Sequence, residues 1–334
     1  MTKCALNKIA SFYALRRALL IIFHLLCLLC LNEAKAQTEL QFSGCADVPK
    51  ITCPGSAGHT GDIEAMAAFR KQWVGIDGSP STTVLAIDGE VKFLSNFHGV
   101  GAIAVSDKIG PFTNTYIDVN YSYHLELNKG FLGLGLRLGA INSSFNASDL
   151  STTVEGLEDD YHQESDMLLQ SSGDDGGTAF DVGCGAFFES KLSYLSFSVL
   201  HLTSPKIETK GNAILKNRPL LTFGAARKVG EKGNVELDPR LFFKTDFTSW
   251  QLEMAADVIF RKKICVGLGY RLQDALFLQF IFDMSNGITL GYAYDISIGN
   301  FGGHTGGSHE IMIGYKFNLD IEKRTKRYKS VRIL

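Results

Sequence analysis

Apolar and polar residues alternate with a period of two through much of the chain. From residue 117 to 127 the odd positions carry Ile, Val, Tyr or Leu, and the even positions carry mostly polar residues. The pattern recurs at 132–139, 250–261, 288–298 and 310–319. Successive side chains of a β-strand point to opposite faces, so each run predicts a strand with one apolar face and one polar face.

A soluble β-sandwich and a membrane β-barrel would both satisfy this pattern. The alternating runs reach ten to thirteen residues, whereas strands of soluble sheets usually have about five or six and tilted membrane-spanning strands about 9–11. The chain also has 23 Phe and 11 Tyr, several of them near strand ends, where membrane barrels place aromatic girdles. These features favour the barrel.

The runs predict an all-β fold, a transmembrane outer-membrane β-barrel of about 14 antiparallel strands between Asp62 and Leu319. An even number of strands returns both termini to one side, which we place in the periplasm. Short inner turns are then expected at 128–130, 190–193, 229–234, 261–263 and 285–287. The longest connections, 146–178 and 204–218, fall outside.

The amino terminus has the pattern of a cleaved secretory signal peptide. Lys and Arg residues precede an apolar run at 18–31, and Ala34-Lys35-Ala36 follows as a small-residue cleavage signal. The expected organisation is a signal peptide at 1–36, a periplasmic or lumenal segment at 37–61, the barrel at 62–319 and a basic periplasmic tail at 320–334. Such a chain resides in the outer membrane.

Composition narrows the function classes. The chain is 45% hydrophobic and 20% charged with a formal net charge of −2, which argues against nucleic-acid binding. Common hydrolase, nucleotide and zinc signatures are missing, so we expect no catalytic residues, no cofactor and no metal. His304, His309 and Glu310 are interpreted as ordinary loop residues rather than a metal cluster. Mixed charges on the inward positions leave an open channel, a ligand cavity and a plugged lumen as alternatives.

The segment from residue 149 to 175 is strongly acidic and lacks Lys and Arg. We interpret it as a solvated outer loop, and the alternatives are calcium capture or docking of a basic partner. No calcium-loop spacing fits it.

Residues 69–80, with the sequence FRKQWVGIDGSP, closely resemble the hallmark of the PorP/SprF family of type IX secretion system membrane proteins. Weaker matches lie at 41–43, 267–271, 291–295 and 308–311. The resemblance implies a non-enzymatic outer-membrane barrel that supports secretion or surface anchoring of a specific large adhesin-type protein with a carboxyl-terminal sorting domain, in some members for gliding motility. Its implied partners are this cargo, other type IX secretion components and outer-membrane lipid.

The hallmark segment supplies the candidate partner-binding residues. Its Gly, Asp and Pro residues indicate a structured turn in the first outer connection. The alternatives are a turn anchored by Trp at the membrane interface and a contact surface for the cargo. The candidates are Trp73, Val74, Gly75, Ile76, Asp77, Gly78, Ser79 and Pro80. At the level of the whole protein, a passive channel or hydrophobic-ligand transporter remains the alternative function.

Two regions depart from the family or add to it. Residues 45–58 replace an aromatic-rich stretch and an Asn-Pro-Ala-x-Ala-Gly motif, and a disulfide between Cys45 and Cys53 is a hypothesis for this region. The tail carries a basic run that is either a frayed end or a periplasmic docking element. Its candidate residues are Lys323, Arg324, Lys326, Arg327, Lys329 and Arg332.

Overall fold

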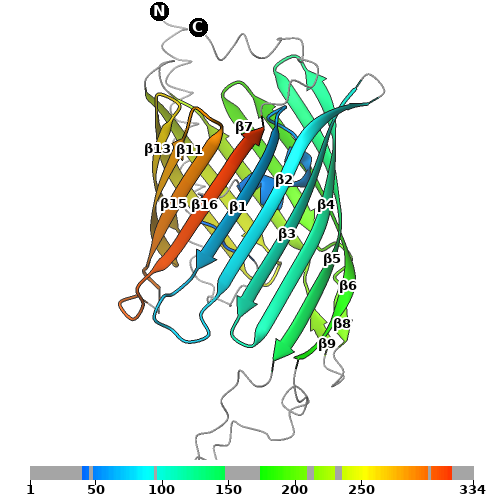
Figure 1. The fold of residues 1–334 in the computed structure, drawn as a ribbon, viewed down its shortest axis with the longest axis vertical. Coiled ribbons are helices and arrows are strands. Elements are labelled where there is room, and N and C mark those ends of the chain that lie inside the picture. Colours follow the sequence, from blue (N-terminus) through cyan, green and yellow to red (C-terminus); the bar gives the residue numbers. More distant parts are fainter. Residues whose placement is uncertain are drawn as a thin grey trace, which may run out of the picture. The chain divides into compact units, whose positions relative to one another are not determined.

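A computed structural model describes residues 40–44, 48–93, 96–146, 174–208, 214–229, 235–299 and 302–317. Its main feature is a closed antiparallel barrel of 14 strands in the order β1-β16-β15-β14-β13-β12-β11-β10-β7-β6-β5-β4-β3-β2 (Figure 1). A separate two-stranded sheet, β8-β9, accompanies it. The predicted fold class and strand number are therefore confirmed. No helix in the described part of the chain has the length and apolar character needed to cross a membrane.

The barrel begins and ends close to the predicted positions. Its strands are β1 (Ile63–Lys71), β2 (Ser81–Phe93), β3 (Asn96–Ile109), β4 (Phe112–Leu127), β5 (Gly130–Asn146), β6 (Asp174–Ser190), β7 (Ser193–Leu200), β10 (Leu220–Arg227), β11 (Val235–Thr245), β12 (Trp250–Phe260), β13 (Ile264–Arg271), β14 (Ala275–Asp283), β15 (Ile288–Ser297) and β16 (Ser308–Phe317). The small sheet is β8 (Lys206–Glu208) and β9 (Ile214–Lys216). A short helix, α2 (Val48–Thr52), and a 3₁₀ turn, η1 (Pro54–Ser56), precede β1.

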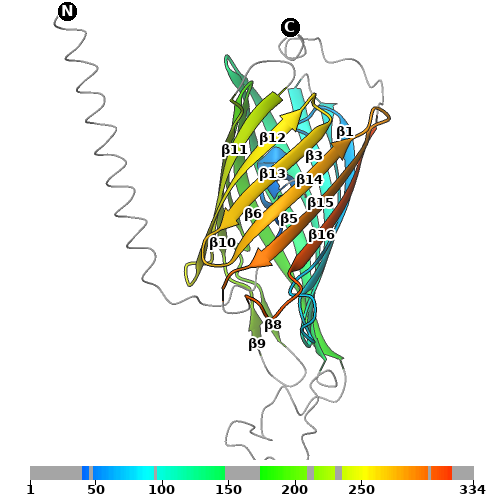
Figure 2. The same ribbon diagram turned by 90° about the vertical axis from the view of Figure 1, so that its left-hand side faces the viewer.

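The two rims of the barrel differ in the lengths of their connections (Figure 2). Connections of two to four residues, at 128–129, 191–192, 261–263 and 284–287, share one rim with the start of β1 and the end of β16. We call it the inner rim. The connections at 72–80, 147–173, 201–219 and 298–307 share the opposite, outer rim. The outer rim also has short connections at 110–111, 246–249 and 272–274, and the inner connection at 228–234 has seven residues. The two longest connections predicted from the sequence thus lie on the outer rim, and the 201–219 connection additionally contains β8 and β9.

Strand β4 illustrates how the sequence pattern becomes two faces. Ile117 and Val119 are 63% and 59% exposed on the outside, where lipid covers them, whereas Asp118 and Asn120 are buried towards the lumen. Because lipid solvates the apolar face, these side chains need no protein partner.

The lumen contains the chain's own residues 40–44 and 48–62, which we call the lumen segment. Its first residues hydrogen-bond wall residues near the outer rim, α2 and η1 contact β4, β5, β6 and β7, and the chain then enters β1 at the inner rim (Figure 1). Of the three alternatives left open by the sequence, the structure has the plugged lumen.

A dry apolar core lies inside the barrel around this segment. Phe42 and Ile51 of the segment pack with lumen-facing side chains of β1, β2 and β3, among others Met66, Val84 and Ile103. Ile207 of β8, only 2% exposed, joins the same cluster. In their middle parts these strands are therefore apolar on both faces, and strict alternation fails there because the segment buries the lumenal face.

Candidate functional site: the filled lumen and its outer rim

One buried polar network joins the lumen segment to the barrel wall near the outer rim. It consists of Ser43, Arg70, Arg271, Asp295 and Glu310, which we call the Ser43 cluster. All five residues are at most 1% exposed. Each comes from a different segment that carries the family resemblance, so residues scattered between positions 43 and 310 meet at one place.

The Ser43 hydroxyl lies at the centre of the cluster. Its Oγ donates to Asp295 Oδ2 at 2.6 Å and accepts from Arg70 Nη1 at 2.7 Å and Arg271 Nη2 at 2.9 Å. The backbone N–H of Ser43 donates to Glu310 Oε2 at 2.8 Å. A serine is the residue that fits here, because one hydroxyl can donate once and accept twice.

The two arginines of the cluster also pair with carboxylates. Arg70 Nη2 lies 2.7 Å from Asp295 Oδ2 and its Nη1 3.3 Å from Glu310 Oε2. Arg271 contacts Asp295 at 3.0 Å, Glu253 at 3.1 Å and Asp274 at 3.1 Å. Buried charges need such pairing, since an isolated ion in a low-dielectric interior is strongly unfavourable. The network therefore fixes the outer end of the lumen segment.

Further wall side chains bind the backbone of the lumen segment, mostly by donating to its carbonyls. Arg137 Nη2 donates to the Ile51 carbonyl at 2.6 Å. The other contacts on segment carbonyls are Lys244 Nζ to Leu40 at 2.9 Å, Ser198 Oγ to Thr52 at 2.7 Å, Ser122 Oγ to Gly55 at 2.8 Å and His124 Nε2 with Ala57 at 3.0 Å. These bonds recognise backbone rather than side chains.

Glycines on the barrel wall let the segment approach closely. A Cβ added at Gly133 or Gly135 would collide with backbone atoms of Gly55, and one at Gly99 would collide with the Ala57 carbonyl. A Cβ added at Gly58, whose φ is +68°, would collide with the Gly89 carbonyl. The segment thus lies directly on a glycine floor of β2, β3 and β5, the close backbone approach for which strand glycines are suited.

The inner end of the segment is held by charge. Lys50 is only 6% exposed and its Nζ lies 2.9 Å from Glu64 and 2.7 Å from Asp88. Asp88 also accepts the Gly58 N–H at 2.8 Å. Paired and hydrogen-bonded ions of this kind tolerate burial.

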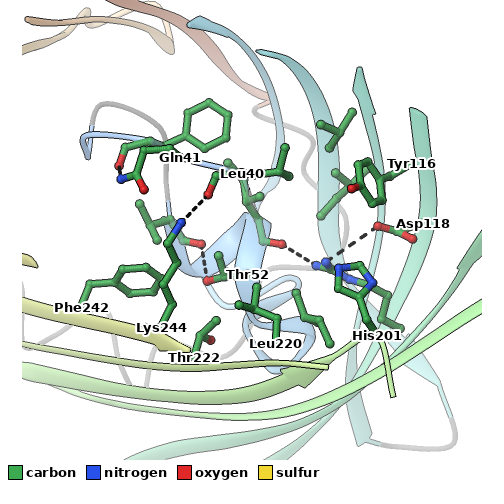
Figure 3. A pocket seen from close by; sticks show the side chains of 17 residues that line it. Leu40, Gln41, Thr52, Tyr116, Asp118, His201, Leu220, Thr222, Phe242 and Lys244 are labelled. Carbon is green, nitrogen blue, oxygen red and sulfur yellow. Dashed lines mark hydrogen bonds and ion pairs between the residues drawn. The ribbon is translucent and has the colours of Figure 1, made fainter. Parts of the chain in front are cut away.

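A small cavity of about 50 Å³ remains between the segment and the wall. Figure 3 shows Leu40, Gln41 and Thr52 on the segment side and Tyr116, His201, Leu220 and Phe242 on the wall side. Its volume suits one or a few water molecules, not a drug-sized ligand.

The hallmark residues lie where the sequence placed them, in the connection from β1 to β2 on the outer rim. The loop is fixed on both sides by backbone hydrogen bonds. Val74 exchanges two with the β15-β16 loop, Val74 N to Gly307 O at 2.9 Å and Gly306 N to Val74 O at 2.7 Å, and Gly110 N donates to Gly78 O at 2.9 Å. Trp73 N donates to Ser308 Oγ at 3.2 Å. The loop is thus ordered, as its turn residues indicated.

The side chains of this loop divide into a buried and an exposed set. Ser79 and Pro80 are buried and Trp73 and Ile76 half-buried, whereas Val74, Gly75, Asp77 and Gly78 are exposed. The exposed residues lie close to the Ser43 cluster. Arg70 of the cluster is on β1, just before the loop, and Ser308, which binds Trp73, is on β16 two residues before Glu310. One set therefore fixes the loop, and the other presents a surface beyond the outer rim.

The β11-β12 loop adds an acidic group to the same rim. Partial burial alone would raise the pKa of Asp246, but hydrogen bonds from the backbone of Ser249 and Thr248 outweigh it and hold that pKa below its usual range. The neighbouring Phe247 is 71% exposed. The Asp246 side chain therefore stays a carboxylate at neutral pH.

Other sequence expectations fall elsewhere. Cys45, the acidic residues 149–173, the basic tail with its docking candidates, the signal peptide and both chain ends lie outside the described residues. His309 and Glu310 do not form a metal cluster, because neighbours on a strand point to opposite faces: His309 bonds Tyr292 on the outside at 2.7 Å, and Glu310 bonds Ser43 inside. Sequence reasoning missed the roles of Ser43 and Arg70, although both lie in the segments that carry the resemblance.

Cys53 is a free, fully buried thiol in the structure, with its Sγ 3.5 Å from the Ala186 carbonyl. Because Cys45 lies outside the described residues, the disulfide stays a prediction. We expect Cys53 to resist maleimide in the folded barrel by at least about tenfold relative to the unfolded chain, since burial excludes the reagent. Peptide mass spectrometry after denaturation without reductant would detect either the labelled thiol or the Cys45–Cys53 pair. Rapid labelling of the folded protein would contradict the plugged lumen.

The chain matches one protein family over most of its length. A family model described as type IX secretion system membrane protein PorP/SprF matches residues 34–315. Among solved structures, the Acinetobacter baumannii outer membrane protein Omp33 is 10% identical with a TM-score of 0.43, over 77% of this chain and 98% of that one. A TodX deltaS2S3 mutant, a monoaromatic hydrocarbon channel, is 9% identical with a TM-score of 0.46, over 82% and 95%. No curated protein matches at a significant level.

Proposed function

From the premise that this chain belongs to the PorP/SprF family of type IX secretion system membrane proteins, we propose that it supports the secretion or surface anchoring of a specific large adhesin-type cargo. It is an outer-membrane β-barrel, and its secretion partners include other components of the type IX system. The proposed role is non-enzymatic. The proposed cargo is one protein with a carboxyl-terminal sorting domain.

The observation that carries the proposal is the Ser43 cluster. The segments of the chain that carry the family resemblance each contribute a residue to it. The cluster binds the lumen segment to β1 and β16, the two strands that lead to the β1-β2 loop and to the loop that it contacts. Such a network keeps the lumen segment inside the barrel and the outer loop ordered, neither of which a solute channel needs. This favours a protein-binding barrel over a passive channel or hydrophobic-ligand transporter.

The exposed part of the β1-β2 loop is the proposed contact surface for the cargo. Val74, 38% exposed, and Asp77 project from a loop whose backbone is already fixed by both neighbours. A preorganised loop loses little conformational entropy on binding, which suits a docking surface. A membrane-interface anchor for Trp73 is compatible with this role, because Trp73 is half-buried and distinct from the exposed pair.

A double substitution, Val74→Lys with Asp77→Lys, tests the contact. We expect the barrel to assemble normally, because the loop is fixed by backbone bonds, and cargo display to fall at least about tenfold, which corresponds to about 1.4 kcal/mol. The measurement is surface cargo per assembled barrel. Phe247→Lys, at an exposed apolar residue of another outer loop, is the matched control. Unchanged display in the double variant would remove the loop from the proposal.

The proposed function itself is tested by quantitative proteomics of surface and periplasmic fractions from a complemented deletion strain. Loss of one or a few large surface proteins, with accumulation or degradation inside, is the expected result. Loss of every substrate of the pathway would instead identify a core component of the machinery. No change would favour the channel alternative.

A further inference from the structure

The inner rim carries a row of basic residues at its turns. Five of the inner connections are described at least in part, and four contain Lys or Arg while none of their described residues is acidic. The cations are Lys129, Lys191, Lys228, Arg261, Lys262 and Lys263. In the sequence, the β10-β11 connection that contains Lys228 also contains Glu231 and Lys232, whose charges cancel. Along this rim, turns of neighbouring hairpins are about 10 Å apart, because two strands separate them.

The outer rim is less basic. In the described parts of its connections the acidic residues are Asp77, Glu208, Asp246 and Asp274, and the cations are Lys206, Lys216 and Arg218. In the sequence, Lys210 also belongs to the 201–219 connection. The 149–175 segment, which enters the same rim, adds only acidic charge in its sequence. The asymmetry places the cations where the barrel meets the periplasmic leaflet.

The β12-β13 turn displays its charges at a cost in backbone strain. Arg261 and Lys262 have φ values of 49° and 55°, and Lys263 N donates to Phe260 O at 3.0 Å. Residues 260–263 thus form a β-turn whose two central residues are both in the left-handed region, the geometry of a type I′ turn, for which Asn-Gly is preferred. Long charged side chains are disfavoured there. A strained outlier of this kind points to a function for the side chains.

The side chains of this turn lie at the level of the membrane interface. The Arg261 guanidinium lies over the ring of Phe260, 5.2 Å from its centroid, and Phe260 is 42% exposed on the lipid-facing side. Lys263 Nζ bonds Ser285 Oγ of the next inner turn at 3.1 Å. On the β6-β7 turn, Leu192 beside Lys191 is 52% exposed. Along the inner rim, cations thus lie beside exposed apolar residues.

We propose that the inner rim, centred on Arg261, Lys262 and Lys263, binds the headgroups of anionic phospholipids in the periplasmic leaflet. The apolar neighbours favour lipid over a soluble acidic protein, because they set the cations at the depth of the phosphate groups. The guanidinium of Arg261 offers a planar fork to phosphate. This surface is separate from the outer rim on which the proposed secretion function rests.

The test uses the full-length barrel in nanodiscs of phosphatidylethanolamine with a minority of phosphatidylglycerol. The lipid that remains bound after detergent extraction is quantified by mass spectrometry. We expect phosphatidylglycerol to be enriched on the wild type, and Arg261→Asn with Lys262→Gly to reduce the enrichment about fivefold for each cation removed. Salt at about 1 M should abolish it, since the screening length falls to about 3 Å.

The same variant separates binding from folding. Asn-Gly is the preferred sequence for this turn, so the variant should unfold at the same denaturant concentration as the wild type or a higher one. Lys216→Asn with Arg218→Asn on the outer rim also removes two exposed cations and is the charge-matched control, which should keep the enrichment. Unchanged enrichment in the inner-rim variant, or equal loss in the control, would overturn the proposal. If the variant keeps phosphatidylglycerol but no longer copurifies with acidic periplasmic proteins, the rim binds protein instead of lipid.

Discussion

Arg271→Met is expected to destabilise the barrel by about 3–5 kcal/mol, because Glu253 and Asp295 then stay buried without the cation that pairs with them. The Arg271 side chain is 1% exposed and contacts the lumen segment as well as three carboxylates. Urea unfolding of the barrel refolded in lipid vesicles, followed by tryptophan fluorescence, measures the change.

Two comparisons make this result specific. Arg218→Met removes an exposed arginine of the outer rim and should change stability by less than about 0.5 kcal/mol. Combining Arg271→Met with Asp295→Asn should recover part of the loss, since the uncompensated charge is then removed as well. A loss of less than about 1 kcal/mol in the free energy of unfolding for Arg271→Met would contradict the ion-pair network around Arg271. Fully additive effects in the double variant would contradict it as well.

The strands were predictable wherever one face of the barrel is apolar and the other polar. Strands β4, β12, β15 and β16 satisfy this condition, because their outer faces contact lipid and their inner faces carry polar groups. The short inner turns were predictable for a related reason: Gly, Asn and charged residues interrupt the alternation there. Local sequence thus suffices where each residue's environment is set by the membrane and the pleat of the strand.

The plug was not predictable by the same means. The Ser43 N–H and Glu310 are 267 positions apart, and no periodicity reports such a contact. On β1, β2 and β3 the inward residues Met66, Val84 and Ile103 are apolar because the lumen segment covers them. Alternation therefore did not identify Arg70 and Asp88, which lie on these strands, as buried inward charges.

The family resemblance indicated the right segments without a physical reason for them. Its motifs at 41–43, 69–80, 267–271, 291–295 and 308–311 have little in common as sequences. In the fold, they are the places where the lumen segment and the wall share one hydroxyl, two guanidinium groups and two carboxylates. A motif spread over distant strands is the expected outcome when a barrel must bind its own amino-terminal segment.

Gly133→Ala with Gly135→Ala is expected to turn a silent barrel into a conducting one. Each added methyl group would collide with backbone atoms of Gly55, which cannot rotate away as a side chain could. The segment must then leave its position between β4, β5 and β6. A barrel of this strand number is too wide for wall side chains alone to fill, so a water path should open. Planar bilayer recordings at fixed voltage measure the change.

The controls separate displacement of the segment from damage to the strand. Gly314→Ala adds a methyl group to another lumen-facing strand position, where the nearest atom is Thr289 Cβ at 3.4 Å, and should stay silent. In backbone terms glycine to alanine stabilises a strand interior by about 0.5–1 kcal/mol, so any loss at the double site must come from the segment. Deleting residues 40–58 should reproduce the open pore. Steady conductance of the wild type would contradict a plugged lumen and favour the channel alternative. If the deletion variant does not conduct, a second element must close the barrel, and β8 and β9 at the outer rim are the nearest candidates.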